Sequence, residues 1–369
     1  MWVRAAEFFA GIGLVRDGLE RAGVEVAFAN DIEPLKAELY GRNYGLADFV
    51  LDDVRNLTGA DVPEVEIATA SFPCTDLSLA GNRAGLVGSE SSMFWEFARI
   101  LEEMPSLPSV VLLENVPSFA TSHGGKDLRA AIAALNDLGY HCDLLSLDAR
   151  DFVPQSRPRL FIVGSTAQVG GEVSMVPTAV RPKWLLRFIE EHGDSLDLDL
   201  ALLGNPEPAA TSLGDIVQRL SPTDDRWWPA ERVDLFVDSL SLIQSDRLAQ
   251  MMEAKGRSWR TAFRRTRQGR AVWEMRADEI SGCLRTARGG SSKQALVEAG
   301  SDSLRIRWMT PREYARLQGV EDSYLLGGVS NNQALFGFGD AVCVPAIAWV
   351  AQHALLPRLS PNLEPALAG

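Results

Sequence analysis

The sequence predicts an α/β protein in which a parallel β-sheet is wrapped by helices and joined to a second, smaller and irregular domain. Strand-like and helix-like segments alternate over the first 165 residues, which is the pattern of such a sheet. Residues 166–305 are rich in proline, tryptophan and charge, with weak periodicity, and regular signals return near Thr310. We therefore expect one domain made of residues 1–165 and 306–360, a second made of residues 166–305, and a tail over 361–369.

The elements follow from apolar runs and helical periodicity. Six runs are predicted to be strands: residues 3–9, 24–30, 65–70, 110–113, 142–147 and 160–163. Two segments between them have helical spacing, namely 92–104, with Ser92 as N-cap, and 127–138, which Gly139 would end.

Two further helices are predicted near the carboxyl end. Thr310 is followed by proline at the first helical position and Glu313 at the third, which is a capping box, and Gly319 would end this helix. Residues 342–356 are almost wholly apolar, so we expect a buried helix that returns to the first sheet.

Composition excludes several classes of protein. The chain has 369 residues, and 46% of them are hydrophobic, which is ordinary for a globular protein. No apolar run approaches the roughly 20 residues that span a bilayer, and signal-peptide features are missing, so we expect a cytoplasmic protein with no membrane association. Its four cysteines and four histidines show no metal-ligand spacing, so neither a metal site nor a disulfide framework is predicted.

Charge is distributed unevenly along the chain. The net charge of −13 argues mildly against a nucleic-acid partner, because phosphate binding needs cations. Residues 255–293, however, contain eleven Lys or Arg and three acids, a local charge of +8, so the remainder carries −21. A basic stretch in an acidic protein is the expected feature of a nucleic-acid-binding surface.

A glycine-containing turn, FAGIG at residues 9–13, follows the first predicted strand. Glycine lets the backbone approach a ligand closely. Asp31 ends the second strand, where an acid can hydrogen-bond ribose hydroxyls, and Asp53 ends the next segment similarly. The third glycine of the dinucleotide fingerprint and a Walker lysine are both missing, so a nucleoside is favoured over NAD or ATP. A tight turn with no ligand is the alternative.

Three predicted strands have reactive or polar side chains just before or just after them. Cys74 follows Pro73 just after strand 65–70, and carboxyl ends of parallel strands are where such sheets place their chemistry. Glu114 ends the next strand, where its carboxyl would lie close to Cys74 and could pass on a proton. Arg157 and Arg159, at alternate positions before strand 160–163, would face one anionic or carbonyl-bearing ligand. The alternatives are a buried apolar cysteine, a loop-capping glutamate and arginines paired with surface acids.

In combination these motifs resemble the DNA cytosine C5-methyltransferase family. Their order along the chain is FAGIG, an acidic strand end, PC followed by a serine four residues later, ENV, QSRPR and REYARLQG. The resemblance covers residues 5–165 and 305–350. It implies a Rossmann-like S-adenosylmethionine-dependent methyltransferase domain with a smaller, irregular target-recognition domain in the variable middle.

The resemblance implies a role for each motif. Cys74 matches the nucleophile, Glu114 the acid beside the cytosine ring, and Arg157 and Arg159 the basic pair, with Arg159 facing the ring O2. Asp31 matches the acid that takes the ribose hydroxyls of S-adenosylmethionine, which leaves as S-adenosylhomocysteine. The whole implied cofactor set is Phe9, Gly11, Gly13, Asp31, Asp53, Pro73 and Asp340, with Asp53 reading the adenine amino group.

The same resemblance implies double-stranded DNA as the substrate of a monomeric enzyme. The implied DNA contacts are Ser78, Arg264, Arg265, Arg267, Arg270, Arg285, Arg288 and Gly289. The arginines of 264–270 would meet phosphates, and the glycine-flanked segment 283–290 looks like a base-reading loop, since Arg is the commonest reader of guanine. A solvated basic face is the alternative, and Trp259 and Trp273 are expected to be core residues. A restriction or defence-system protein is a further candidate partner.

The implied chemistry explains the residue types. A thiolate that adds at C6 of cytosine leaves electron density at C5, which then takes the methyl group. The base must leave the helix for this step, because C6 is inaccessible inside a stacked duplex.

Two positions depart from the family pattern. Leu14 replaces a usual third glycine, and Asp340 replaces an asparagine near the cofactor, where a negative charge would weaken binding or change which sulfonium is accepted. Two other functions stay open, namely a catalytically silent DNA-binding subunit and a tRNA methyltransferase of the same family. The intact catalytic motifs speak against the first, and the sizeable middle domain against the second.

Overall fold

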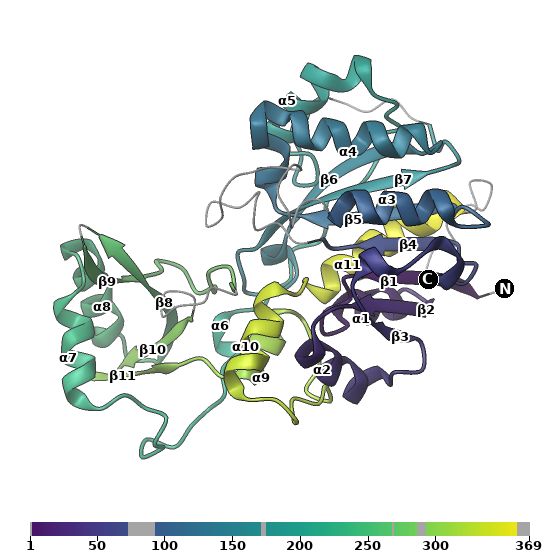
Figure 1. Ribbon diagram of the computed structural model, residues 1–369. Helices are drawn as coiled ribbons and strands as arrows, with labels where there is room; N and C mark the ends of the chain where they lie inside the picture. Colours follow the sequence, from purple (N-terminus) through teal and green to yellow (C-terminus); the bar gives the residue numbers. More distant parts are fainter. Residues whose placement is uncertain (1, 73–92, 171–174, 268, 286–292, 360–369) are drawn as a thin grey trace, which may run out of the picture. The chain divides into compact units, whose positions relative to one another are not determined.

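The computed structural model covers the 369-residue chain and describes residues 2–72, 93–170, 175–267, 269–285 and 293–359. The chain forms two compact units (Figure 1). The first unit consists of Met1–Asp148, Pro158–Glu207 and Val344–Gly369, and the second of Ala149–Arg157 and Pro208–Cys343.

These units divide the chain differently from the expected domain boundaries. Residues 166–207 belong to the first unit because they pair with its edge strand, as in the hydrogen bond from the Ser146 amide to the Val180 oxygen (2.8 Å). Residues 306–343 belong to the second unit, and the first of them complete a strand of its sheet.

The first unit is built on a seven-stranded sheet of order β3-β2-β1-β4-β5-β7-β6. Its strands are β1 (Val3–Phe8), β2 (Val24–Asp31), β3 (Phe49–Leu51), β4 (Ile67–Ala70), β5 (Val110–Asn115), β6 (His141–Asp148) and β7 (Pro158–Ser165). All six predicted strands are confirmed, and the three-residue β3 is an addition at the edge. The prediction of a wholly parallel sheet is wrong in one respect. Strand β7 runs antiparallel to both β5 and β6, because β6 and β7 are joined as neighbours without a crossover helix.

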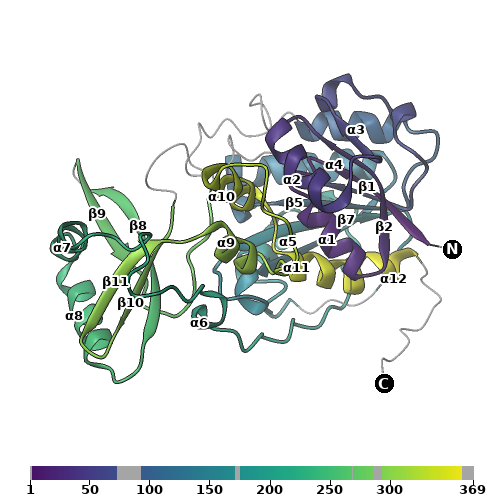
Figure 2. The same cartoon turned by 90° about the horizontal axis from the view of Figure 1, so that it is seen from below.

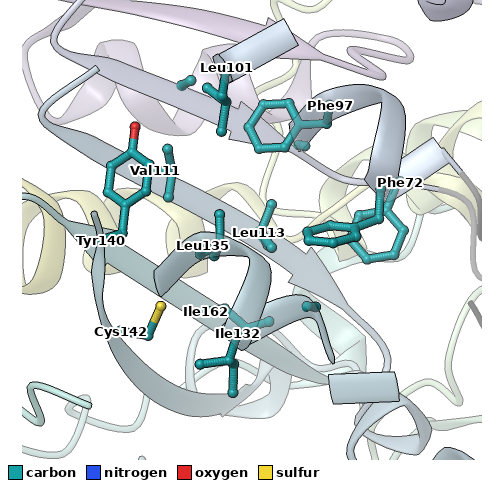
Figure 3. Packing of buried hydrophobic residues seen from close by; sticks show 14 of the residues in the cluster. Phe72, Phe97, Leu101, Val111, Leu113, Ile132, Leu135, Tyr140, Cys142 and Ile162 are labelled. Atoms are coloured by element: carbon teal, nitrogen blue, oxygen red, sulfur yellow. The ribbon is translucent and has the colours of Figure 1, made fainter. Parts of the chain in front are cut away.

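Helices cover both faces of this sheet. They are α1 (Leu14–Arg21), α2 (Pro34–Tyr44), α3 (Met93–Glu103), α4 (Lys126–Asp137), α5 (Lys183–His192), α11 (Val344–Val350) and α12 (Leu356–Leu359). The predicted helices 92–104 and 127–138 are confirmed as α3 and α4, although Ser92 lies outside the described residues. Figure 3 shows the core that α3 and α4 form with the central strands, in which Phe97, Leu113 and Ile132 are fully enclosed.

The carboxyl-terminal helix returns to the first sheet, as predicted. Helix α11 packs on α1 so closely that a Cβ atom added at Gly18 would lie 2.5 Å from Ile347. The sequence showed no apolar run of bilayer length, but the helical run Asn331–Leu359 is long and apolar enough by composition to cross a membrane. Its most apolar stretch is 67% buried, which is typical of a core helix.

The second unit contains a four-stranded antiparallel sheet of order β11-β10-β8-β9. The strands are β8 (Ser258–Arg267), β9 (Arg270–Met275), β10 (Ala295–Gly300) and β11 (Ser303–Trp308). Helices α7 (Ala230–Asp238) and α8 (Leu242–Glu253) lie side by side against this sheet (Figures 1 and 2). This unit is therefore more regular than its weak periodicity predicted, because its core residues are widely spaced along the chain, from Trp228 to Ile306. Trp273 packs into that core, as expected, between Trp228 and Trp308.

Among the described residues the second unit has three further α-helices: α6 (Leu213–Ile216), α9 (Pro311–Leu317) and α10 (Asn331–Asp340). The capping box at Thr310 is confirmed, since the Thr310 side chain accepts a hydrogen bond from the Glu313 amide and the Glu313 carboxylate accepts one from the Thr310 amide. Gly319 follows the helix in a left-handed conformation (φ 75°), as predicted.

Candidate active site

The turn after β1 has an unusual backbone. Phe9 adopts a left-handed conformation (φ 58°), and so does Gly11 (φ 58°). A non-glycine residue there costs about 1 kcal/mol or more, and such strain clusters at functional sites. The Gly11 amide donates to Asp31 Oδ2 at 2.8 Å, which joins the ends of β1 and β2. A Cβ atom at Gly11 would have only the Phe9 oxygen within 4 Å among the described atoms, so the turn is open on that side.

Gly13 is required for a reason that the sequence did not show. Its φ is 83°, and an added Cβ atom would lie 2.5 Å from Tyr44 Cε2 and 3.0 Å from Tyr40 Cδ2. The missing side chain at Gly13 therefore lets α2 pack against the turn.

The two predicted nucleoside-binding acids differ in their surroundings. Asp31 is buried at the end of β2, and besides Gly11 it accepts the Glu33 amide at 2.8 Å. Asp53 accepts the amide and the guanidinium of Arg55, and the Arg55 hydrogen bonds lower the pKa of this carboxyl. Two exposed apolar side chains that sequence reasoning missed stand next to these strand ends, Ile32 (61% exposed) and Leu51 (49%). Their only sequence signal is their position beside the acids.

The strand that leads into the glycine-containing turn carries a buried carboxyl group. Glu7, in β1, is fully buried, and this burial raises the pKa of Glu7 to about 8, although Arg16 opposes the shift. The Arg16 guanidinium donates to the Tyr40 hydroxyl (3.1 Å) and lies over the rings of Tyr40 and Tyr44. Sequence reasoning missed this group, since a lone glutamate in a strand gives no sign of its depth.

Glu114 and Arg159 meet where β5 ends and β7 begins. The distance from Arg159 Nε to Glu114 Oε1 is 2.8 Å, and the side chains are 15% and 10% exposed. The antiparallel pairing of β5 with β7 produces this contact, because it places Glu114 opposite Phe161, two residues after Arg159. The side-chain nitrogen Nδ2 of Asn115 donates to the Phe72 main-chain oxygen at 3.4 Å, which fixes the residues just after β4 beside this pair. A carboxylate and a guanidinium held together are suited to binding the amide-like edge of a heterocycle.

Several predicted residues lie outside the described part of the chain. They are Pro73, Cys74, Ser78, Arg288 and Gly289. Cys74 follows Phe72 by two residues, and Phe72 is tied to the strand that carries Glu114. The role of each of these residues stays a prediction.

Arg157 and Arg159 are two residues apart in the chain but have different bonding partners. Arg157 is 2% exposed, and its guanidinium donates to the oxygens of Leu284 (2.9 Å) and Ala341 (2.5 Å) and to Cys283 Sγ (3.4 Å). These partners all belong to the second unit, whereas Arg159 is paired with a carboxylate. Asp340 lies at the exposed end of α10.

Four of the predicted DNA-binding arginines belong to the strands β8 and β9 of the second unit. Arg264 and Arg265 are exposed on β8, and Arg265 Nε lies 2.9 Å from Glu274 Oε2. Arg267 and Arg270 are backbone partners in the register of the β8–β9 hairpin. Arg285 is exposed just before the undescribed part of segment 283–290. In the described residues no group of three or more His, Cys, Asp or Glu side chains could hold a metal ion.

The fold and the motifs define a methyltransferase of the cytosine-C5 class. The chain belongs to this family, because the family model described as C-5 cytosine-specific DNA methylase matches residues 3–355. Type II methyltransferase M.NlaX of Neisseria lactamica is 30% identical over 94% of this chain and 94% of its own length. Type II methyltransferase M.HhaI of Haemophilus parahaemolyticus is 26% identical over 95% of this chain and 94% of its own.

Solved structures agree with the fold. The Dnmt2 methyltransferase of S. pombe superposes with a TM-score of 0.64 at 19% identity, over 98% of this chain and 100% of that one. The methyltransferase EhMeth of Entamoeba histolytica gives a TM-score of 0.65 at 14% identity, over 99% of each chain. The family uses S-adenosylmethionine and acts on DNA, so both apply to this chain at that level.

Proposed function

We propose that this protein transfers a methyl group from S-adenosylmethionine to C5 of a cytosine that has been flipped out of a specific duplex DNA sequence, through a transient bond between Cys74 and C6. The observation that carries this proposal is the Glu114–Arg159 pair at the carboxyl end of the sheet (2.8 Å), with the strand that leads to Cys74 tied beside it. The flipping itself follows from the chemistry, since C6 is shielded inside a stacked duplex.

The proposed reaction uses each of these side chains at a stated atom. The Cys74 thiolate adds to C6 and breaks the aromaticity of the ring, which places an electron pair at C5. The Glu114 carboxyl, when protonated, donates to N3, and Arg159 donates to O2, so both stabilise the charge that develops on the ring. The C5 electron pair would then form a bond to the methyl group that the cofactor supplies, with S-adenosylhomocysteine as the leaving group. A base would next remove the C5 proton, and the electrons of that bond would re-form the C5–C6 double bond and expel the Cys74 thiolate. Arg157, whose guanidinium binds main-chain oxygens, supports the site rather than touching the ring.

The turn after β1 fits the adenosyl part of S-adenosylmethionine. Its open side at Gly11 admits close approach, and Asp31 stands at the neighbouring strand end to accept the ribose hydroxyls. Ile32 and Leu51 offer apolar surface for the adenine ring, with Asp53 nearby in the chain to accept its amino group. The bound cofactor supplies an electrophilic methyl group and leaves as S-adenosylhomocysteine.

The second unit would hold the DNA. Arg264, Arg265, Arg267 and Arg270 belong to one hairpin, β8–β9, where they would neutralise phosphates and make binding steeply salt-dependent. The segment 283–290 would read base edges with Arg285 and Arg288. We further propose that the enzyme acts as a cytoplasmic monomer, beside a restriction or defence-system protein.

Methyl transfer from labelled S-adenosylmethionine to mixed-sequence DNA, with tRNA as competitor, tests the proposal. We expect label in DNA at C5 of cytosine, and its sequence context gives the target. Glu114→Gln and Arg159→Lys should each lower kcat by about 100-fold or more while DNA affinity is kept. Transfer to tRNA alone would instead identify the RNA branch, and no transfer to either would identify a silent DNA-binding subunit.

A further inference from the structure

A short segment of the second unit interrupts the sheet of the first. Residues Ala149–Arg157 belong to the second unit, although β6 precedes them and β7, which carries Arg159, follows them directly. This segment is paired with the stem of the proposed base-reading loop: the Ser156 amide donates to the Ser281 oxygen (2.9 Å), and the Ser281 amide donates to the Pro154 oxygen (2.7 Å). The stem and the approach to β7 are thus one hydrogen-bonded structure.

Three buried side chains extend this structure, and we call Gln155, Arg157 and Gln318 the linking cluster. Gln155, which is fully buried, donates to the Leu317 oxygen (2.7 Å) and accepts the Leu284 amide (3.2 Å). Gln318, also fully buried, donates to the oxygens of Phe338 (2.6 Å) and Ala341 (3.1 Å). The two amides are themselves hydrogen-bonded at 3.2 Å.

Arg157 binds both the loop stem and the carboxyl end of α10. One terminal nitrogen donates to the Leu284 oxygen (2.9 Å) in the loop stem. The other donates to the oxygens of Gly339 (3.2 Å) and Ala341 (2.5 Å) at the end of α10. A planar guanidinium can hold two such segments at a fixed separation, whereas a lysine ammonium is a point charge on a flexible stem and cannot.

We propose that Arg157, supported by Gln155 and Gln318, is a positioning residue that holds the stem of the base-reading loop, residues 281–285, in fixed register with the turn 339–341. The proposal rests on the proposed function, because it assigns that loop to DNA. The base-reading loop therefore starts from a stem whose position is fixed by one guanidinium. Arg157 therefore contributes to sequence discrimination without touching DNA.

The test compares Arg157→Lys with Arg150→Lys, a matched substitution in the same segment at an exposed arginine that contacts Ser156. We expect Arg157→Lys to lower kcat on the preferred sequence by about 10- to 100-fold with KM for S-adenosylmethionine changed less than about twofold. Its preference for that sequence over single-base-pair variants should fall by about tenfold or more. Arg150→Lys should match wild type in all three quantities. An equal loss of rate on every sequence, with discrimination unchanged, would overturn the proposal.

A second measurement is independent of catalysis. Hydrogen exchange of the DNA-free protein should show faster exchange at the Leu284 and Ala341 amides in Arg157→Lys than in Arg150→Lys, with the core amide of Ala262 unchanged. Gln155→Met should show the same effect at Leu284, which covers the case in which Arg157→Lys does not fold. Equal exchange in all variants would refute the linking role, while lack of methyl transfer by the wild-type protein would count against the proposed function alone.

Discussion

One added methyl group at Gly13 should disrupt the turn that carries the proposed cofactor site. A left-handed φ of 83° costs an alanine about 1 kcal/mol. The new Cβ atom would also lie 2.5 Å from one ring carbon of Tyr44 and 2.8 Å from the next, and such overpacking costs about 1–3 kcal/mol. Gly23 provides the control, because its φ is 84° but no atom lies within 4 Å of its added Cβ. Gly13→Ala should therefore destabilise the protein by about 1–3 kcal/mol more than Gly23→Ala.

Urea unfolding of the two variants measures this difference, and calorimetric titration with S-adenosylmethionine measures its consequence. We expect weaker cofactor binding in Gly13→Ala only, because the displaced Tyr44 moves the turn. Adding Tyr44→Ala to Gly13→Ala should remove the two shortest contacts and leave the conformational cost and the 3.0 Å contact with Tyr40. Equal destabilisation by the two single substitutions would show that the contact between the turn and α2 is not tight, and the reasoning would fail.

Three further predictions concern buried charge and the site. Between about pH 4.5 and 8 the folded protein retains the proton of Glu7 that the unfolded chain releases, so its stability falls as pH rises through this window. Glu7→Gln should match wild type near the lower limit and be the more stable protein near the upper one, as thermal unfolding at both pH values would show. Arg307→Met should cost about 3–5 kcal/mol because it leaves the Glu313 carboxylate buried and unpaired, and adding Glu313→Gln should restore much of that loss in the same assay. Combining Arg264→Ala with Arg265→Ala should make the plot of log binding constant against log salt concentration less steep, by the amount expected for the loss of about two phosphate contacts. An unchanged slope would show that the DNA does not contact these two arginines.

Local sequence signals predicted the first unit well. Its six apolar runs all form strands of the first sheet. In the second unit, the capping box at Thr310 specifies a helix start by its own hydrogen bonds. The direction of β7 was not predictable, because an apolar run reads the same in a parallel or an antiparallel strand. The second sheet was missed because its core residues are spread over about 80 positions, from Trp228 to Ile306, with charged residues between many of them, which gives a weak periodic signal.

The candidate site was predicted by motif rather than by geometry. The pairing of Glu114 with Arg159 depends on the antiparallel register of β7, which only the structure supplies. The spacing of Arg157 and Arg159 in the sequence predicted the same role for both. In the structure Arg157 binds main-chain oxygens, whereas Arg159 is paired with a carboxylate. The burial of Glu7 and the contact of Gly13 with Tyr44 are tertiary properties that no local pattern encodes.

The most direct test of the proposed mechanism is to incubate the protein with S-adenosylmethionine and duplex DNA whose cytosines carry fluorine at C5. Fluorine cannot leave as a proton does, so a thiol that adds to C6 becomes trapped on the base. We predict a stable complex in which mass spectrometry locates the methylated fluoropyrimidine on Cys74, and which Cys74→Ser does not form although it binds DNA normally. Methyl transfer to ordinary cytosine without any trapped complex, or a complex that persists in Cys74→Ser, would contradict covalent catalysis by this residue.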